Sequence, residues 1–86
     1  MGYSVKWRQK ALKSLRKLPK EISKRIVKRI DLVKENPKHF LEKLVDDPGF
    51  KVRTGDYRII IDVIDEEEVI AVRLIGHRRN IYKRKL

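Results

Sequence analysis

Residues 50–75 read FKVRTGDYRIIIDVIDEEEVIAVRLI, and this stretch decides the fold. Short runs rich in β-branched side chains alternate in it with turn-forming residues, which is the pattern of antiparallel strands. The predicted elements are strands at 50–53, 57–63 and 69–75, joined by a Thr-Gly-Asp hairpin turn at 54–56 and an acidic turn at 65–67. The stretch therefore predicts a three-stranded antiparallel meander.

The first half of the chain carries helical spacing. Residues 3–7 alternate as a short strand, and two apolar stripes follow: Ala11, Leu12, Leu15 and Leu18, then Ile22, Ile26, Ile30 and Val33. Pro19 separates the two predicted helices, and Asn36-Pro37 ends the second. Helices joined this tightly form an antiparallel pair. We therefore predict one α+β domain over residues 1–86, with the N-terminal strand and helix hairpin packed on one face of an antiparallel β-sheet.

Two details of this prediction concern the edges of the core. Residues 39–48 could form a helical turn through Phe40, Leu41 and Leu44. In the last strand the alternation assigns Ile70, Val72 and Leu74 to the helix-covered face, and Val69, Ala71, Arg73 and Ile75 to the other face.

The chain is strongly basic, with 23 Lys and Arg against 12 Asp and Glu and a formal charge of +11. The two ends of the chain are basic, whereas in the middle acidic side chains partly offset the basic ones. So much like charge destabilises a small protein unless a polyanion offsets it. Nucleic acid, a membrane surface and an acidic protein are the candidate partners, in that order.

Other features exclude several classes of protein. There is no cysteine, so disulfides and thiolate metal sites are absent, and the two histidines form no ligand pattern. Lys6 and Arg8 interrupt any N-terminal signal, so we expect a cytoplasmic protein. The apolar stripes have the width of core-facing helices, which favours a core over a membrane surface.

Candidate chemistry lies on the predicted sheet. Lys51 and Arg53 are two apart on one strand and share a face, and Arg58 and Arg78 follow nearby. Convergent cations suit phosphate binding and stabilisation of a phosphorane-like transition state. The alternative is that these cations simply form the solvated face of a strand. The spacing alone favours this alternative, and the excess of positive charge weakens that preference. Tyr82 could stack on bases or transfer a proton.

Two motifs resemble the RelE/ParE superfamily of toxins, most closely its archaeal RelE branch. They are Arg53-Thr-Gly-Asp-Tyr-Arg58-Ile-Ile and Gly76-His-Arg-Arg-Asn-Ile-Tyr82, preceded by Ala11-x-x-x-Leu15-x-x-Leu18-Pro19 and Leu32-x-x-x-Asn36-Pro37. The resemblance covers nearly the whole chain and implies the fold derived above. It also implies a toxin of a type II toxin–antitoxin system that cuts messenger RNA in the ribosomal A site through the ribose 2′-hydroxyl, without metal or other cofactor. The implied partners are the ribosome and an acidic, RelB-like antitoxin.

The resemblance also assigns residues. It makes Lys51, Arg58, Arg78 and Tyr82 catalytic, and Arg53, His77, Arg79 and Lys83 RNA- or phosphate-binding. The chain departs from the best-known RelE enzymes where Gly49 replaces one of two strand lysines and His77 replaces another lysine. The general base is therefore open between Lys51, Tyr82 and His77. Two rival hypotheses remain: a ParE-like inhibitor of DNA gyrase, and a non-enzymatic RNA-binding protein.

Overall fold

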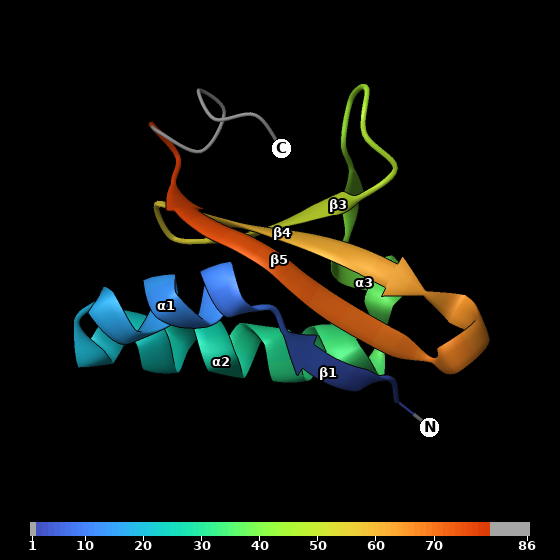
Figure 1. The fold of residues 1–86 in the computed structure, drawn as a ribbon, viewed down its shortest axis with the longest axis horizontal. Coiled ribbons are helices and arrows are strands. Elements are labelled where there is room, and N and C mark those ends of the chain that lie inside the picture. Colours follow the sequence, from blue (N-terminus) through green and yellow to red (C-terminus); the bar gives the residue numbers. More distant parts are fainter. Residues whose placement is uncertain (1, 80–86) are drawn as a thin grey trace.

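A computed structural model describes residues 2–79 and contains a five-stranded sheet with strand order β1-β5-β4-β3-β2 (Figure 1). The elements are β1 (Ser4–Trp7), α1 (Gln9–Lys17), α2 (Lys20–Glu35), α3 (Pro37–Phe40), β2 (Glu42–Lys43), β3 (Phe50–Thr54), β4 (Tyr57–Ile64), a 3-10 turn (Asp65–Glu67) and β5 (Val69–His77). β1 runs parallel to β5, and the other neighbours are antiparallel. The α1–α2 pair lies on one side of the sheet, so the predicted α+β class is confirmed.

The helices form where the apolar stripes predicted them. Pro19 separates the two helices as predicted, but it is the N-cap that precedes α2 instead of the first helical residue, and its carbonyl accepts hydrogen bonds from the amides of Ile22 and Ser23. Ala11 of α1 and Ile26, Ile30 and Val33 of α2 are buried at helical spacing.

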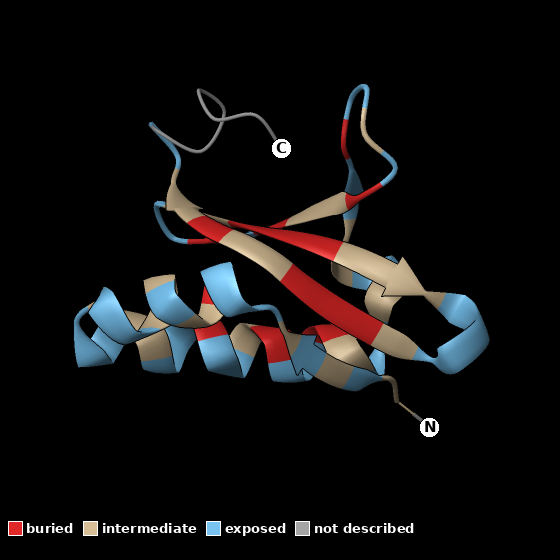
Figure 2. Cartoon of the chain, viewed as in Figure 1, coloured by how far each residue is buried: buried red, intermediate tan, exposed pale blue. Residues whose placement is uncertain are grey.

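One hydrophobic core lies between these helices and the sheet. Buried residues line β4, β5 and the helix surfaces that face them (Figure 2). The strand residues of this core are Val52, Ile59, Ile61, Ile70, Val72 and Ile75. The helices α1 and α2 cover one face of the sheet, and the opposite face is called the open face below.

The predicted sheet faces of Leu74 and Ile75, at the end of the last strand, are wrong. Ile75 packs in the helix-side core, whereas Leu74 joins Leu44 and Ile60 in a small separate cluster. The reason is a β-bulge: Ile60 pairs with Leu74 but Ile61 pairs with Val72, which leaves Arg73 as an extra residue in β5. One extra residue reverses the alternation beyond it.

The segment before β3 also differs from the prediction. The helical turn is confined to Pro37–Phe40, and the chain then extends into the edge strand β2. Leu44 packs with Ile60 instead of lengthening the turn. Strand pairing therefore overrides the local helical pattern here, and it brings Glu42 opposite Lys51.

Candidate functional site

Three of the predicted cations lie on the open face. Arg53 of β3 stands directly opposite Arg58 of β4, and Lys51 lies two residues along on the same face of β3. Arg58 in turn faces Gly76 of β5, which has no side chain to cover it. Like charges directly opposite each other destabilise a sheet. An arginine pair in this position therefore fits a site that binds an anion.

The hairpin turn fixes the position of Arg58. Gly55 occupies the first central position of the turn with φ +59°, a conformation that primed hairpin turns require and glycine adopts readily. Nη1 of Arg58 donates hydrogen bonds to the carbonyls of Gly55 at 3.1 Å and Tyr57 at 3.0 Å. A guanidinium has five N–H donors, so the group is anchored through one nitrogen while others can bind an anion.

A carboxylate that sequence reasoning missed stands among these cations. Glu42 of β2 pairs with Lys51 in register, and one of its oxygens lies 3.9 Å from Lys51 Nζ while the other lies 3.5 Å from Arg53 Nε. Its side chain is half exposed. The two-residue strand that carries it is too short to be recognised from alternation, so no sequence signal marked Glu42.

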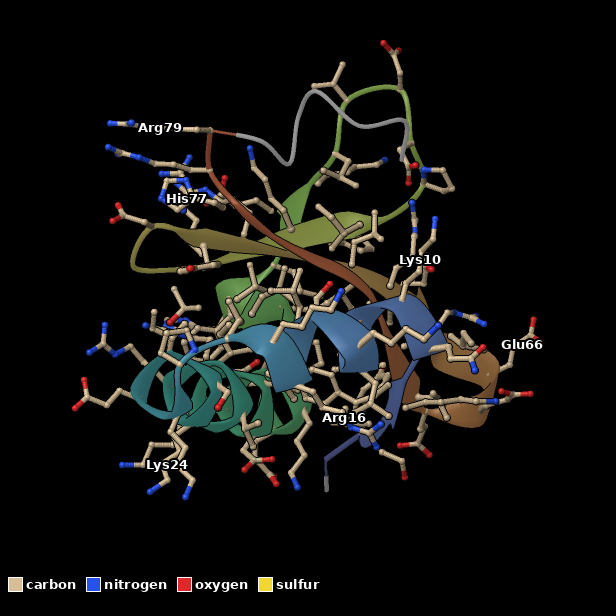
Figure 3. All side chains as sticks on the ribbon, turned by 60° about the vertical axis from the view of Figure 1, so that its left-hand side comes forward. Lys10, Arg16, Lys24, Glu66, His77 and Arg79 are labelled. Atoms are coloured by element: carbon tan, nitrogen blue, oxygen red, sulfur yellow. The ribbon has the colours of Figure 1, made fainter. Side chains whose placement is uncertain are left out.

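The end of β5 holds the remaining described candidates. The Arg78 amide donates to the Asp56 carbonyl at 2.7 Å, and its Nε lies 3.6 Å from Asp56 Oδ1, so Arg78 is tied to the hairpin turn. Nδ1 of His77 accepts a hydrogen bond from the Arg79 amide at 3.2 Å. Figure 3 shows His77 and Arg79 together at this end of the molecule, far from Glu66.

His77 faces away from the arginine pair. It is the register partner of Tyr57, and the two rings meet edge to face with centroids 5.5 Å apart. Tyr57 packs against the helix-side core, so His77 lies at the rim of the covered face, whereas Arg53 and Arg58 lie on the open one. The structure thus separates His77 from the cations with which sequence reasoning grouped it.

The departure from the family pattern at Gly49 has a structural cause. A Cβ at this position would lie 2.6 Å from Arg73 Nη2, 3.0 Å from Asp47 Oδ1 and 3.1 Å from the Ile61 carbonyl oxygen. A side chain there would have to displace the end of Arg73 and press on Asp47 and the Ile61 carbonyl, so a lysine at Gly49 would disturb this network.

Arg73 is the centre of that network. It donates two hydrogen bonds to Asp47, both of 3.0 Å, and two to Asp62. Hydrogen bonds from Arg73 and from the Gly49 amide lower the pKa of Asp47 from 3.8 to about 2, and the two carboxylates raise the pKa of Arg73. The network fixes the loop between β2 and β3 against the sheet, and so helps to set the position of both strands.

Tyr82 and Lys83 lie outside the described residues. Within residues 2–79 no group of three or more His, Asp or Glu side chains is arranged to hold a metal ion. None of the helices in the same part of the chain is both long and apolar enough to cross a membrane.

Comparison with known proteins identifies the family of this chain. Residues 5–82 match the family described as the ParE toxin of type II toxin–antitoxin systems. The chain is 33% identical over 81 residues to the mRNA interferase toxin RelE of Escherichia coli K12, covering 91% of this chain and 85% of that protein.

Two solved toxin–antitoxin complexes contain a similar fold. The RelBE2 complex of Mycobacterium tuberculosis matches with a TM-score of 0.83 and 25% identity over 91% of this chain and 100% of that one. The RelE–RelB complex of the archaeon Pyrococcus horikoshii matches with a TM-score of 0.74 and 28% identity over 91% and 97%. The chain therefore belongs to the RelE/ParE superfamily, as a RelE-like toxin of a type II toxin–antitoxin system.

Proposed function

We propose that this toxin is a ribosome-dependent endoribonuclease that cleaves messenger RNA in the A site. The observation that carries the proposal is the Arg53–Arg58 pair beside Lys51, on a sheet face that α1 and α2 leave uncovered. A phosphodiester anion would offset the repulsion between these cations. The name of the Escherichia coli relative, an mRNA interferase, supports the same activity.

The proposed reaction is an internal transesterification. The ribose 2′-oxygen attacks the adjacent phosphorus, the bond to the 5′-oxygen breaks, and the products are a 2′,3′-cyclic phosphate and a 5′-hydroxyl. Arg58 and Arg78 would neutralise the charge that develops on the phosphate oxygens. Arg53 and Arg79 would bind the RNA backbone, and Lys83 would support these contacts. His77, which faces away from the arginine pair, would contact RNA only beyond the scissile phosphate. Tyr82 would stack on a base and hold the nucleotide in line.

The shape of this face supports the proposed dependence on the ribosome. The cations project from a sheet surface, and flexible RNA bound there is not constrained to the in-line geometry that transesterification needs. Alignment of reacting groups is worth roughly 7–11 kcal/mol of the barrier in favourable cases. We propose that the decoding centre supplies this alignment, and that the toxin therefore acts in the cytoplasm.

The test is to add purified toxin to ribosomes stalled with an open A site and to map new messenger ends. Naked RNA and DNA gyrase are assayed in parallel. Cleavage confined to the A-site codon is the expected result. Inhibition of gyrase with intact messenger would indicate a ParE-like toxin, which is the type that the description of the matching family names. Tight RNA binding with neither effect would make it a plain binding protein.

We also propose a RelB-like antitoxin as partner, because the Mycobacterium tuberculosis and Pyrococcus horikoshii relatives are described in complexes with RelB proteins. The outer surface of the helix pair offers a groove of about 680 Å³ with apolar walls from Leu15 and Val27. Four basic side chains, Arg16, Lys24, Arg25 and Lys28, and two acidic ones, Glu21 and Asp31, also line it, so the cations are in excess. An amphipathic acidic helix would match both features. Co-purification with the neighbouring gene product in moderate salt tests this, and failure to form a complex would contradict it.

A further inference from the structure

We infer that Glu42 is the general base of the proposed cleavage, the group that accepts the proton from the ribose 2′-hydroxyl. This inference rests on the proposed nuclease function. Three of the residues with assigned roles on the open face, Lys51, Arg53 and Arg58, carry basic side chains, and a protonated lysine or arginine has no acceptor for a proton. Glu42 is the carboxylate that β2 places among them.

The position of Glu42 suits this role. Because β2 pairs with β3, its carboxylate lies 3.9 Å from Lys51 Nζ and 3.5 Å from Arg53 Nε. Arg53 stands opposite Arg58, so a phosphate held between the two arginines has the Glu42 carboxylate at its edge. A ribose 2′-hydroxyl is bonded to the carbon next to the one that carries the scissile phosphate. A base beside the phosphate site is therefore a base beside the nucleophile.

The contacts of Glu42 also allow it to change partners. Both separations exceed the 2.7–2.9 Å of a strong charge-assisted hydrogen bond, and half of the side chain is exposed. Exposed ion pairs of this kind contribute little stability, so substrate can break them cheaply. When a phosphodiester takes over Lys51 and Arg53, the carboxylate loses its counterions and faces a second negative charge. The carboxylate is then available to accept the proton of the ribose 2′-hydroxyl.

The step is balanced without a co-reactant. Glu42 takes the 2′-hydroxyl proton as the 2′-oxygen forms its bond to phosphorus. The bond to the 5′-oxygen breaks, and that oxygen takes a proton from water. Glu42 then returns its proton to the solvent. No other residue needs to be deprotonated at neutral pH, so Lys51 can remain a cation that binds phosphate.

The test compares Glu42→Gln with wild type on A-site-programmed ribosomes under single-turnover conditions. General base catalysis contributes about 100-fold to 10,000-fold in rate. Glu42→Gln should therefore slow cleavage about 100-fold or more. Its affinity for a complex whose A-site codon carries 2′-O-methyl groups, which measures binding without reaction, should be equal or tighter. Glu66→Gln is the matched control, because it removes the same charge at the far end of the sheet (Figure 3), and it should cleave like wild type.

Two further measurements separate a base from a residue that merely orders the cations. Glu42→Asp should recover part of the lost rate. Formate should restore cleavage to Glu42→Ala, because a small carboxylate can replace a missing base but cannot rebuild an ion-pair geometry. Wild-type-like cleavage by Glu42→Gln, or the absence of rescue by formate, would overturn the assignment while the nuclease function stands. Intact messenger with the wild-type toxin would refute the nuclease function and the Glu42 assignment together.

Discussion

The substitution Gly49→Ala tests whether the Arg73 network sets the loop beside the proposed site. The added methyl would lie 2.6 Å from Arg73 Nη2, well inside van der Waals contact, and 3.1 Å from the Ile61 carbonyl oxygen, which is a tight contact. Asp47 Oδ1, at 3.0 Å from the same methyl, accepts hydrogen bonds from the Gly49 amide and from Arg73. One methyl group therefore disturbs the whole network at once.

The expected magnitude follows from these contacts. Overpacking of a well-packed site costs about 1–3 kcal/mol. Arg73 and Asp47 are mostly buried, with side chains 20% and 16% exposed, so the network cannot simply move into solvent. We expect a loss of about 2 kcal/mol in the free energy of unfolding. In a domain of this size each kcal/mol lowers Tm by roughly 4–8 °C.

The assay is urea denaturation followed by circular dichroism, in a double-mutant cycle with Arg73→Met. Removing the guanidinium takes away the nearest obstruction, so the penalty of Gly49→Ala should become clearly smaller in that background. An unchanged midpoint for Gly49→Ala would refute the steric argument. An equal penalty with and without Arg73 would show that Ile61, not the network, excludes the side chain.

Three other predictions concern the site, acid stability and the core. Arg58→Ala combined with Arg78→Ala should abolish toxicity in a growth assay while the circular dichroism spectrum is kept, because each arginine is expected to contribute about 2–4 kcal/mol of transition-state stabilisation; normal killing would contradict the site assignment. The folded-state pKa of Asp47, about 2, lies below its ordinary value of 3.8, so its stabilising contribution is present above about pH 4 and is lost as the pH falls toward 2. Asp47→Asn should remove this loss when the free energy of unfolding is measured against pH between 4 and 2. An unchanged pH dependence would argue against the network. Ile26→Ala, at a fully buried position, should cost about 2–5 kcal/mol in urea denaturation, and a loss below 1 kcal/mol would show that α2 packs loosely.

Local patterns were enough to predict the helices and the main strands. The stripe from Ile22 to Val33 has helical period, and the Thr-Gly-Asp turn separates two runs of β-branched residues. Both patterns depend only on residues that are close together in the chain, so the sequence alone is enough to predict these elements. The same holds for the shared face of Lys51 and Arg53, which strand alternation fixes.

The errors arose where one strand depends on another. The bulge at Arg73 is stabilised by Asp47 and Asp62, which lie 26 and 11 residues away in the sequence. The alternation of residues within β5 therefore does not predict it. That single extra residue exchanged the faces of Leu74 and Ile75. Likewise His77 is adjacent in sequence to Arg78, yet it packs on Tyr57 across the sheet from the arginine pair.

The sequence by itself determined the α+β class, the order of the main elements, the excess positive charge and the arginines of the proposed site, because residue type and spacing encode these features directly. Only the tertiary structure decided that Arg53 stands opposite Arg58, that a side chain at Gly49 would meet Arg73 and Asp47, and that Glu42 lies among the cations. Each of these depends on the register between strands. Register is set by side chains that meet across the sheet, and their partners are distant in the chain.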